Sequence, residues 1–253
     1  MSNKRQEIIE NYEQHLIGLD DVFAFKCRNC GQCCKNREDL MLNSRDIFNL
    51  AKAVSLTNEQ AIEKYCETYV GKDSRIPILR LLPVGASKAC PLFINNRCSI
   101  HALKPTVCAL YPLGRAMAFK SDEEGEAKDA SESQSNEVKY VLSTSSCGSL
   151  KKKQTVREWL AEFNIPVDDI FYLKWNQTLM SLRAAVKGLE GKPGVTDKVL
   201  EMLWGGMYMA LYVKYDTKKE FYPQFEANIS AIQTLLSELQ MMMKASEAFF
   251  KKR

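Results

Sequence analysis

The chain has 253 residues, 45% of them hydrophobic and 26% charged, and a formal net charge of +4 at pH 7. This composition is ordinary for a globular protein able to bury a sizeable core without a metal, and the charge is too small to argue for a nucleic-acid partner. The N-terminal residues lack the apolar core of a signal peptide, and no apolar run approaches the roughly 20 residues that span a bilayer, so we expect a cytoplasmic protein without a membrane partner.

The N-terminal part combines predicted helices with a cysteine-rich loop. Apolar residues at helical spacing predict a helix over residues 4–19. The sequence Cys27-Arg28-Asn29-Cys30-Gly31-Gln32-Cys33-Cys34 follows as a loop, in which Gly31 permits a tight turn. Ser44 is predicted to cap the next helix. Thr57-Asn58-Glu59-Gln60 matches a capping box and starts another, whose apolar face extends over Cys66.

The middle of the chain has the features of short strands. Residues 76–82 are apolar, and residues 90–94 and 97–100 flank Asn95-Asn96, a two-residue hairpin turn. Residues 115–120 and 137–143 alternate like paired strands. Between them, residues 121–136 are acidic and serine-rich, which predicts a mobile loop that can be shortened without loss of metal.

The C-terminal part is predicted to be helical. A capping box at Thr155 starts a short helix, and longer helices follow over residues 167–189, 196–215 and 224–251. The sequence therefore predicts an α+β fold, with a small irregular β-region whose cysteine-rich metal-binding loops are framed by helices. We expect a metal-binding domain over residues 1–163 and a helical region over residues 164–253 that packs on it.

Cysteine is the unusual feature of the composition, because the chain has nine cysteines and an odd number cannot pair completely. Cysteines as close as Cys27, Cys30 and Cys33 cannot all form disulfides with one another without severe strain, but their thiolates can point at one small volume. In a reducing compartment such clusters indicate metal or redox sites. The cysteines predicted as metal ligands lie in loops or at strand ends, with Pro or Gly nearby: Cys27, Cys30, Cys33, Cys34, Cys90, Cys98, Cys108 and Cys147.

We assign structural roles to Cys66, the ninth cysteine, and to His101, which lies near Cys98 in the sequence. Cys66 lies in the predicted helix on an apolar face, so we expect a buried core residue and not a ligand. His101 follows Cys98 by three residues and can ligate a metal or donate to a cysteine sulfur, but a structural role in the turn is the favoured interpretation.

These motifs together resemble the YkgJ-like cysteine-cluster proteins, whose domain chelates zinc or iron. The resemblance extends over about residues 24–163 and rests on Cys27-x-x-Cys30-Gly31-x-Cys33-Cys34, Leu42-Asn43-x-x-Asp46-Ile47-x-x-Leu50-Ala51, Cys90-Pro91-Leu92, Cys98-x-Ile100-His101-x-x-x-Pro105-x-x-Cys108-x-x-Tyr111-Pro112 and Cys147-Gly148. The chain departs from the family pattern at Lys104, often Arg, at Tyr111, often Phe, and at Cys147-Gly148, where Cys-Pro-Gly is usual. No departure removes a candidate ligand.

Two metals suit this set of thiols. Cys27, Cys30 and Cys33 have the spacing of a bacterial ferredoxin cluster, whose fourth cysteine comes from a distant segment. Zinc more often uses paired C-x-x-C knuckles, and only one half of such an arrangement is local here. We therefore favour iron, as an iron–sulfur cluster, and keep zinc as the alternative.

Three functional interpretations remain open on the sequence. The first is a metal-binding protein with a structural, redox or metal-handling role. The second is an iron–sulfur enzyme of a group-transfer type, because flagellin lysine methylases are similar in the cysteine cluster, although they are longer chains. The third is an interaction module whose metal holds the fold, with an unknown protein partner. The glycines of residues 188–194 follow a helix and not a strand, so they do not predict a nucleotide site.

Overall fold

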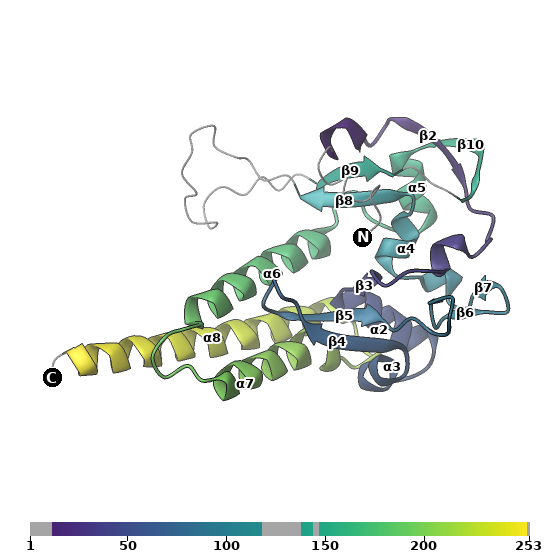
Figure 1. Ribbon diagram of the computed structural model, residues 1–253. Helices are drawn as coiled ribbons and strands as arrows, with labels where there is room; N and C mark the ends of the chain where they lie inside the picture. The colour runs from purple at the N-terminus through teal and green to yellow at the C-terminus, as the bar shows by residue number, and fades with distance from the viewer. Residues whose placement is uncertain (1–11, 118–137, 144–146, 252–253) are drawn as a thin grey trace. The chain divides into compact units, whose positions relative to one another are not determined.

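The fold is α+β, as predicted. The computed structural model describes residues 12–117, 138–143 and 147–251, which contain seven α-helices and several small sheets (Figure 1). Every strand pair in these residues is antiparallel, so the described chain holds no doubly wound parallel sheet. None of the described helices combines the length and hydrophobicity that a bilayer crossing requires.

The helices and strands have the following bounds. The α-helices are α2 (Ser44–Ala53), α3 (Asn58–Tyr65), α4 (Thr106–Leu110), α5 (Val156–Glu162), α6 (Ile170–Leu189), α7 (Asp197–Tyr208) and α8 (Phe221–Lys251). The 3-10 turns are η1 (Tyr12–His15), η2 (Gln32–Cys34) and η3 (His101–Leu103), and a π-helical turn, η4 (Met209–Val213), continues α7. The strands are β1 (Leu16–Ile17), β2 (Val22–Lys26), β3 (Met41–Leu42), β4 (Cys66–Val70), β5 (Pro77–Leu81), β6 (Phe93–Ile94), β7 (Arg97–Cys98), β8 (Leu113–Met117), β9 (Val138–Leu142) and β10 (Ser149–Thr155).

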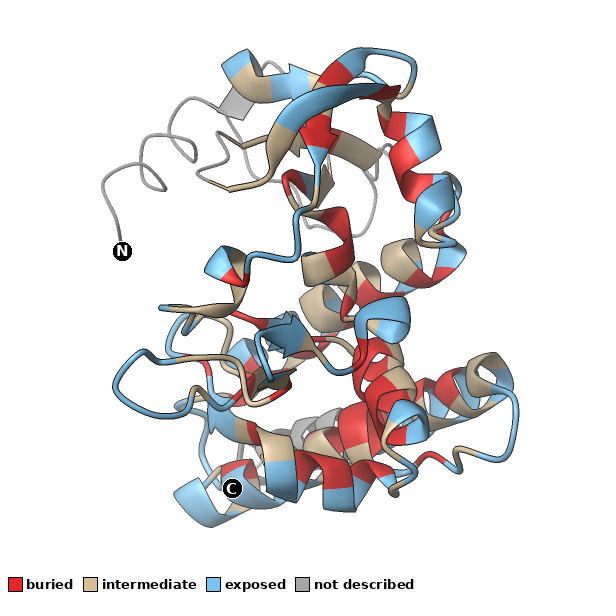
Figure 2. Cartoon of the chain, turned by 90° about the vertical axis from the view of Figure 1, so that its right-hand side faces the viewer, coloured by how far each residue is buried: buried red, intermediate tan, exposed pale blue. Residues whose placement is uncertain are grey.

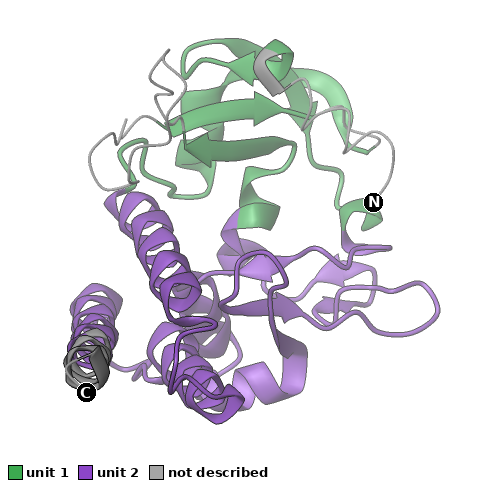
Figure 3. Cartoon of the chain, turned by 60° about the vertical axis from the view of Figure 1, so that its left-hand side comes forward, with its two compact units in different colours: residues 1–33, 107–169 green, residues 34–106, 170–253 purple. Residues whose placement is uncertain are grey.

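The chain folds into two compact units, shown in green and purple in Figure 3. Unit 1 comprises residues 1–33 and 107–169, and unit 2 comprises residues 34–106 and 170–253. Each unit is therefore assembled from two stretches that are separated in the sequence. The division at residue 163 stays a prediction, and the predicted loop over residues 121–136 lies outside the described residues.

Unit 1 is built from two antiparallel sheets. One has the order β1-β9-β8, and the pairing of β8 with β9 confirms the predicted strand pair. The other joins β2 to β10, with an irregularity in register between Ser149 and Lys153. Neither β2 nor β10 is predicted from the sequence. Since they are far apart along the chain, only the tertiary structure brings their edges together.

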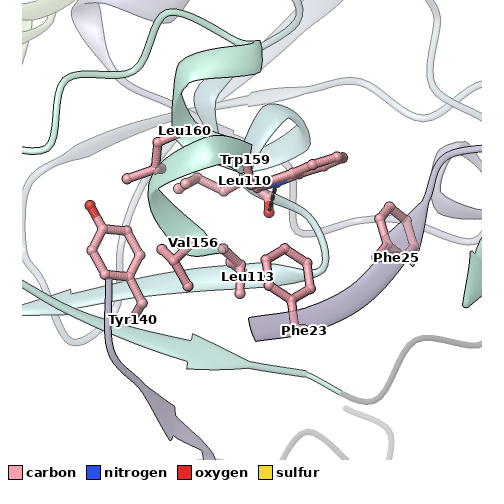
Figure 4. Packing of buried hydrophobic residues seen from close by; sticks show 8 residues of the cluster. All are labelled: Phe23, Phe25, Leu110, Leu113, Tyr140, Val156, Trp159 and Leu160. Carbon is pink, nitrogen blue, oxygen red and sulfur yellow. Dashed lines mark hydrogen bonds between the residues drawn. The ribbon is translucent and has the colours of Figure 1, made fainter. Parts of the chain in front are cut away.

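The core of unit 1 packs helix α5 onto these strands (Figure 4). Helix α5 begins with the predicted capping box, in which the Thr155 hydroxyl accepts from the Glu158 amide. The indole of Trp159 donates to the Leu110 carbonyl at 3.0 Å. The Phe25 ring lies edge-on to Trp159, with ring centroids 5.5 Å apart. The side chains of this core are Phe23, Phe25, Leu110, Leu113, Tyr140, Val156, Trp159 and Leu160.

Unit 2 packs helices against a sheet with the order β3-β5-β4. Helix α2 is capped by Asn43, one residue before the predicted Ser44, because the Asn43 side chain accepts from the Asp46 amide. Helix α3 begins with the predicted capping box at Thr57. In Figure 2, buried and exposed residues alternate along the helices, as expected for amphipathic segments.

The long C-terminal helices lie close to their predicted positions. The segment predicted over residues 196–215 is α7 continued by the π-helical turn η4, and its buried Met207, Leu211 and Tyr212 belong to the core. Helix α8 begins at Phe221, so Pro223 lies in its first turn, where a missing N–H leaves no helical bond unmade.

Two helix predictions are wrong. Residues 4–11 lie outside the described residues, but η1 and β1 replace the helix predicted to reach residue 19. Pairing of Leu16 with Val141 overrides the local helical spacing there. The second error is Cys66, which is not in a helix: α3 ends at Tyr65, and Cys66 is the first residue of β4, opposite Leu81.

Candidate metal centre

The first cysteine cluster folds as two successive turns that direct backbone N–H groups at sulfur. The amide of Asn29 donates to Cys27 Sγ at 3.4 Å, and Asn29 adopts a positive φ of 51°. In the second turn, the amide of Gln32 donates to the Cys30 sulfur, and Gly31 between them adopts a φ of 71°. Asparagine and glycine tolerate this left-handed backbone best, which explains why they occupy these positions.

Cys147 joins this cluster from the second sequence segment of unit 1, residues 107–169. Its side chain is hydrogen-bonded to that of Cys30, and the Gly148 amide donates to the Cys30 sulfur. Donation by the Gln32 amide, followed by the Gly148 and Cys147 bonds, lowers the pKa of the Cys30 thiol, while desolvation and, to a smaller extent, the neighbouring Cys33 oppose the shift. Cys30 is therefore a thiol whose anionic form is stabilised, as a metal ligand requires.

Gly148 allows this approach because no side chain fits at its position. Its φ is +85°, and an added Cβ would lie 2.3 Å from the nearest atom of the Phe25 ring. Phe25 is buried in the core of unit 1, with 2% of its surface exposed. The Phe25 ring therefore leaves no room for a side chain at residue 148, whose amide donates to the Cys30 sulfur.

Tyr111 lies next to Cys147. The Cys147 thiol donates to the Tyr111 hydroxyl across 3.6 Å. The ring of Tyr111 lies edge-on to that of Phe25, with centroids 5.9 Å apart. Tyr111 and Cys27 both pack against the core of unit 1. The cysteines on this side of the cluster thus rest on apolar, well-packed residues.

Cys108 lies in the short helix α4, whose first residue is anchored by a buried carboxylate. Asp46 accepts from the Thr106 amide at 2.8 Å and from the Thr106 hydroxyl at 2.7 Å. Its other oxygen accepts from the Asn43 amide at 3.2 Å. Burial raises the pKa of Asp46, and the Thr106 and Asn43 donors oppose that rise. Asp46 of the sequence motif is thus hydrogen-bonded to Thr106, the residue at which the helix that carries Cys108 begins.

Cysteines 34, 90 and 98 lie in unit 2. The Cys90 amide donates to the Cys34 carbonyl at 2.8 Å, which joins two segments that are far apart in the sequence. Cys98 pairs with Phe93 in the β6–β7 hairpin. The predicted hairpin turn is confirmed, with positive φ angles of 50° at Asn95 and 58° at Asn96.

Cys66 is buried, with 7% of its surface exposed. Burial, with a smaller effect of the nearby Cys90, raises the pKa of the Cys66 thiol to about 12. A thiol that resists ionisation is a poor metal ligand, since the ligand is the thiolate. The prediction that Cys66 is not a ligand thus has a physical basis, although its predicted helical position is wrong.

None of the nine cysteines, all within the described residues, forms a disulfide. The candidate ligands are distributed over both units: residues 27, 30, 33, 108 and 147 belong to unit 1, and residues 34, 90 and 98 to unit 2. In the described part of the chain, no three His, Cys, Asp or Glu side chains gather closely enough to hold a metal ion. Cys30 and Cys147 are brought together as a hydrogen-bonded pair. The fit to a metal lies in the soft thiol donors and in the N–H groups directed at them.

Sequence reasoning identified the cysteines but assigned no role to Tyr111, Gly148 or Asp46. All three occur in the motifs that carry the family resemblance. Two of them carried a signal in the sequence. Tyr111 has a hydroxyl where the family often has Phe, and Gly148 directly follows the isolated Cys147. Phe25, whose ring leaves no room for a side chain at Gly148, gives no local signal, because the two residues are more than a hundred positions apart in the sequence.

A protein-family model, CxxCxxCC, matches residues 26–131 and is described as "Putative zinc- or iron-chelating domain". The match agrees with the resemblance to the cysteine-cluster family and supports metal binding in general for residues 26–131. The searches of curated proteins and of solved structures each found no match.

Proposed function

We propose that this protein binds iron, as an iron–sulfur cluster, through cysteine thiolates, and that zinc is the alternative metal. The proposed ligands are Cys27, Cys30, Cys33, Cys34, Cys90, Cys98, Cys108 and Cys147. Eight thiolates match two centres of four ligands each, because both a tetrahedral zinc site and a cubane cluster take four.

The observation that carries the proposal is the set of amides directed at sulfur. Cys27 accepts from one backbone N–H, and Cys30 accepts from two, those of Gln32 and Gly148. A thiol gains little from such donors, whereas a thiolate is stabilised by each of them. Because a metal displaces the thiol proton, donors that stabilise the anion favour metal binding at neutral pH.

The preference for iron rests on spacing and on ligand origin. Cys27, Cys30 and Cys33 follow the ferredoxin pattern, which takes its remaining cysteine from a distant segment. Cys147 meets this description, since it is distant from Cys30 in the sequence and hydrogen-bonded to it. A bound iron–sulfur cluster would supply one-electron redox chemistry, and bound zinc would supply structural rigidity. The thiolates of this chain would hold either group.

Purification without oxygen tests the proposal. A brown protein with iron and acid-labile sulfide in equal amounts would support a cluster, whereas a colourless protein with bound zinc would support the alternative. Protein that holds neither metal after anaerobic purification and reconstitution would refute metal binding. Substitution of each cysteine by serine then separates the ligands, and Cys66→Ser is the matched control that should keep full metal. If Cys66→Ser loses metal while Cys30→Ser keeps it, the ligand assignment is wrong.

A further inference from the structure

Strand β10 carries a bulge where it runs beside β2 in unit 1 (Figure 1). Ser149 pairs with Lys26 and Lys153 pairs with Ala24, so a longer stretch of β10 lies opposite a shorter stretch of β2. The extra residues of a bulge have no partner on the neighbouring strand, and the ladder is disrupted there. Leu150, in this bulge, has 76% of its surface exposed, the largest exposed fraction of any large hydrophobic side chain in the described residues.

Three exposed lysines lie close to Leu150 in the β2–β10 ribbon: Lys26, Lys151 and Lys153. Successive residues of a strand alternate between its two faces, and residues that pair across an antiparallel ladder share a face. The buried Phe25 points into the core of unit 1, so the adjacent Lys26 points to the outer face. Lys153 pairs with the residue before Phe25 and points to the same outer face.

The charge at this end of the ribbon is positive. Lys152, the remaining lysine of the bulge, forms an ion pair with Glu162 at 2.8 Å, so these two charges cancel. The acidic Asp20 and Asp21 precede β2, whose other end is Lys26. The length of the strand separates them from Lys26 by about 13 Å. This exceeds the Debye length of about 8 Å at physiological salt, so these carboxylates do not cancel the charge of the lysines.

The combination of an aliphatic side chain with lysines indicates the chemistry of the partner. Surfaces that bind other proteins are enriched in aromatic residues and arginine and depleted in lysine. Surfaces that bind single-stranded nucleic acid add aromatic rings on which bases stack. An anionic membrane takes both groups found here. Its surface potential attracts lysines, and an apolar side chain is buried at the boundary between headgroups and acyl chains.

We propose that Leu150 with Lys26, Lys151 and Lys153, here called the Leu150 bulge, contacts an anionic membrane surface. Leu150 enters the boundary between headgroups and acyl chains, and the lysines lie among the headgroups. The contact is weak and reversible, because one aliphatic side chain buries little apolar surface. A surface contact requires no spanning segment, so this proposal replaces the expectation that the chain has no membrane partner. It does not depend on bound metal.

The experiment measures co-sedimentation of the full chain with phosphatidylcholine vesicles that contain about 30% phosphatidylserine, and with vesicles of phosphatidylcholine alone. We expect binding to the anionic vesicles only, and loss of that binding when salt is raised from about 0.1 M to about 1 M. Leu150→Ala shortens the inserted side chain and should weaken binding about tenfold. Lys151→Gln combined with Lys153→Gln should weaken it about 25-fold, which is about fivefold for each lysine.

Unit 2 provides matched controls for these variants. Met202 on α7 has 70% of its surface exposed, and Met202→Ala should keep full vesicle binding. Lys187 and Lys198 are exposed, so Lys187→Gln combined with Lys198→Gln removes the same charge away from the Leu150 bulge and should also keep it. Leu150→Met retains an apolar side chain of similar size and should bind nearly as well as wild type.

Several results would overturn the inference. They are a wild-type chain that sediments with neither vesicle at low salt, undiminished binding in Leu150→Ala, or equal losses in the control variants. Equal binding to vesicles of phosphatidylcholine alone would refute the role of the lysines. Competition by poly-glutamate or a single-stranded oligonucleotide, with an affinity that Leu150→Ala leaves unchanged, would show a general site for polyanions and would refute the assignment to lipid. The metal content of the same samples is measured separately, so a failure here is distinguishable from a failure of the proposed function.

Discussion

A methyl group added at Gly148 tests how closely the backbone after Cys147 packs against Phe25 in the core of unit 1. In Gly148→Ala the new Cβ would lie 2.3 Å from the Phe25 ring, far inside contact distance, at a φ of +85°. Left-handed backbone costs a non-glycine residue about 1–2 kcal/mol. Forcing a methyl group into a packed site costs a further 1–3 kcal/mol or so, about 2–5 kcal/mol in all. Phe25 cannot move aside cheaply, because its ring is edge-on to both Trp159 and Tyr111.

Gly194 provides the matched control for this substitution. Its φ is also +85°, but nothing lies within 4 Å of the position of its Cβ. In Gly194→Ala the free energy of unfolding should therefore fall only by the cost of the left-handed backbone, about 1–2 kcal/mol. The free energy of unfolding is measured by urea denaturation of both variants in the presence of a chelator, so that metal does not contribute. Equal losses in Gly148→Ala and Gly194→Ala would show that the Phe25 contact costs nothing, and the packing argument would be wrong.

Three other buried polar or ionisable groups give separate predictions. Asp169 and Arg115 form an ion pair at 3.0 Å, with 2% and 3% of their side chains exposed, so Asp169→Asn should lower the free energy of unfolding in urea by about 3–5 kcal/mol. Asp46→Asn replaces the carboxyl acceptor of the Thr106 amide and hydroxyl, and chemical denaturation should show a loss of about 1–3 kcal/mol in the free energy of unfolding; an unchanged midpoint would contradict the anchoring role of Asp46. Burial raises the pKa of Cys66 to about 12, above the value of an unfolded thiol. The protonated thiol therefore stabilises the metal-free protein fully below about pH 8.5, and this contribution declines by about 1.4 kcal/mol per pH unit above it. The stability advantage of wild type over Cys66→Ala should shrink accordingly in unfolding curves at rising pH, and a constant advantage would refute the shift.

Elements with local signals were predictable, and elements that depend on distant partners were not. The capping boxes at Thr57 and Thr155 and the Asn95-Asn96 turn follow from side chains and backbone within a few residues. Strands β2 and β10 carry no such signal, because each is stabilised by the other across more than a hundred residues. Cys66 shows the same limit: helical spacing placed it in α3, but pairing with Leu81 makes it the start of a strand.

For the site, too, the sequence reveals what depends on neighbouring residues and not what depends on residues far apart in the chain. Spacing identifies Cys27 and Cys30 as candidate ligands, because the turns that direct amides at their sulfurs are local. It cannot say what holds Cys147, since that depends on the fit of Gly148 against Phe25. A glycine after an isolated cysteine is informative only once the ring that excludes a side chain is known. The position of Cys147 in the cluster is therefore a property of the core of unit 1 as much as of the motif, and substitutions in that core should alter metal binding without touching a ligand.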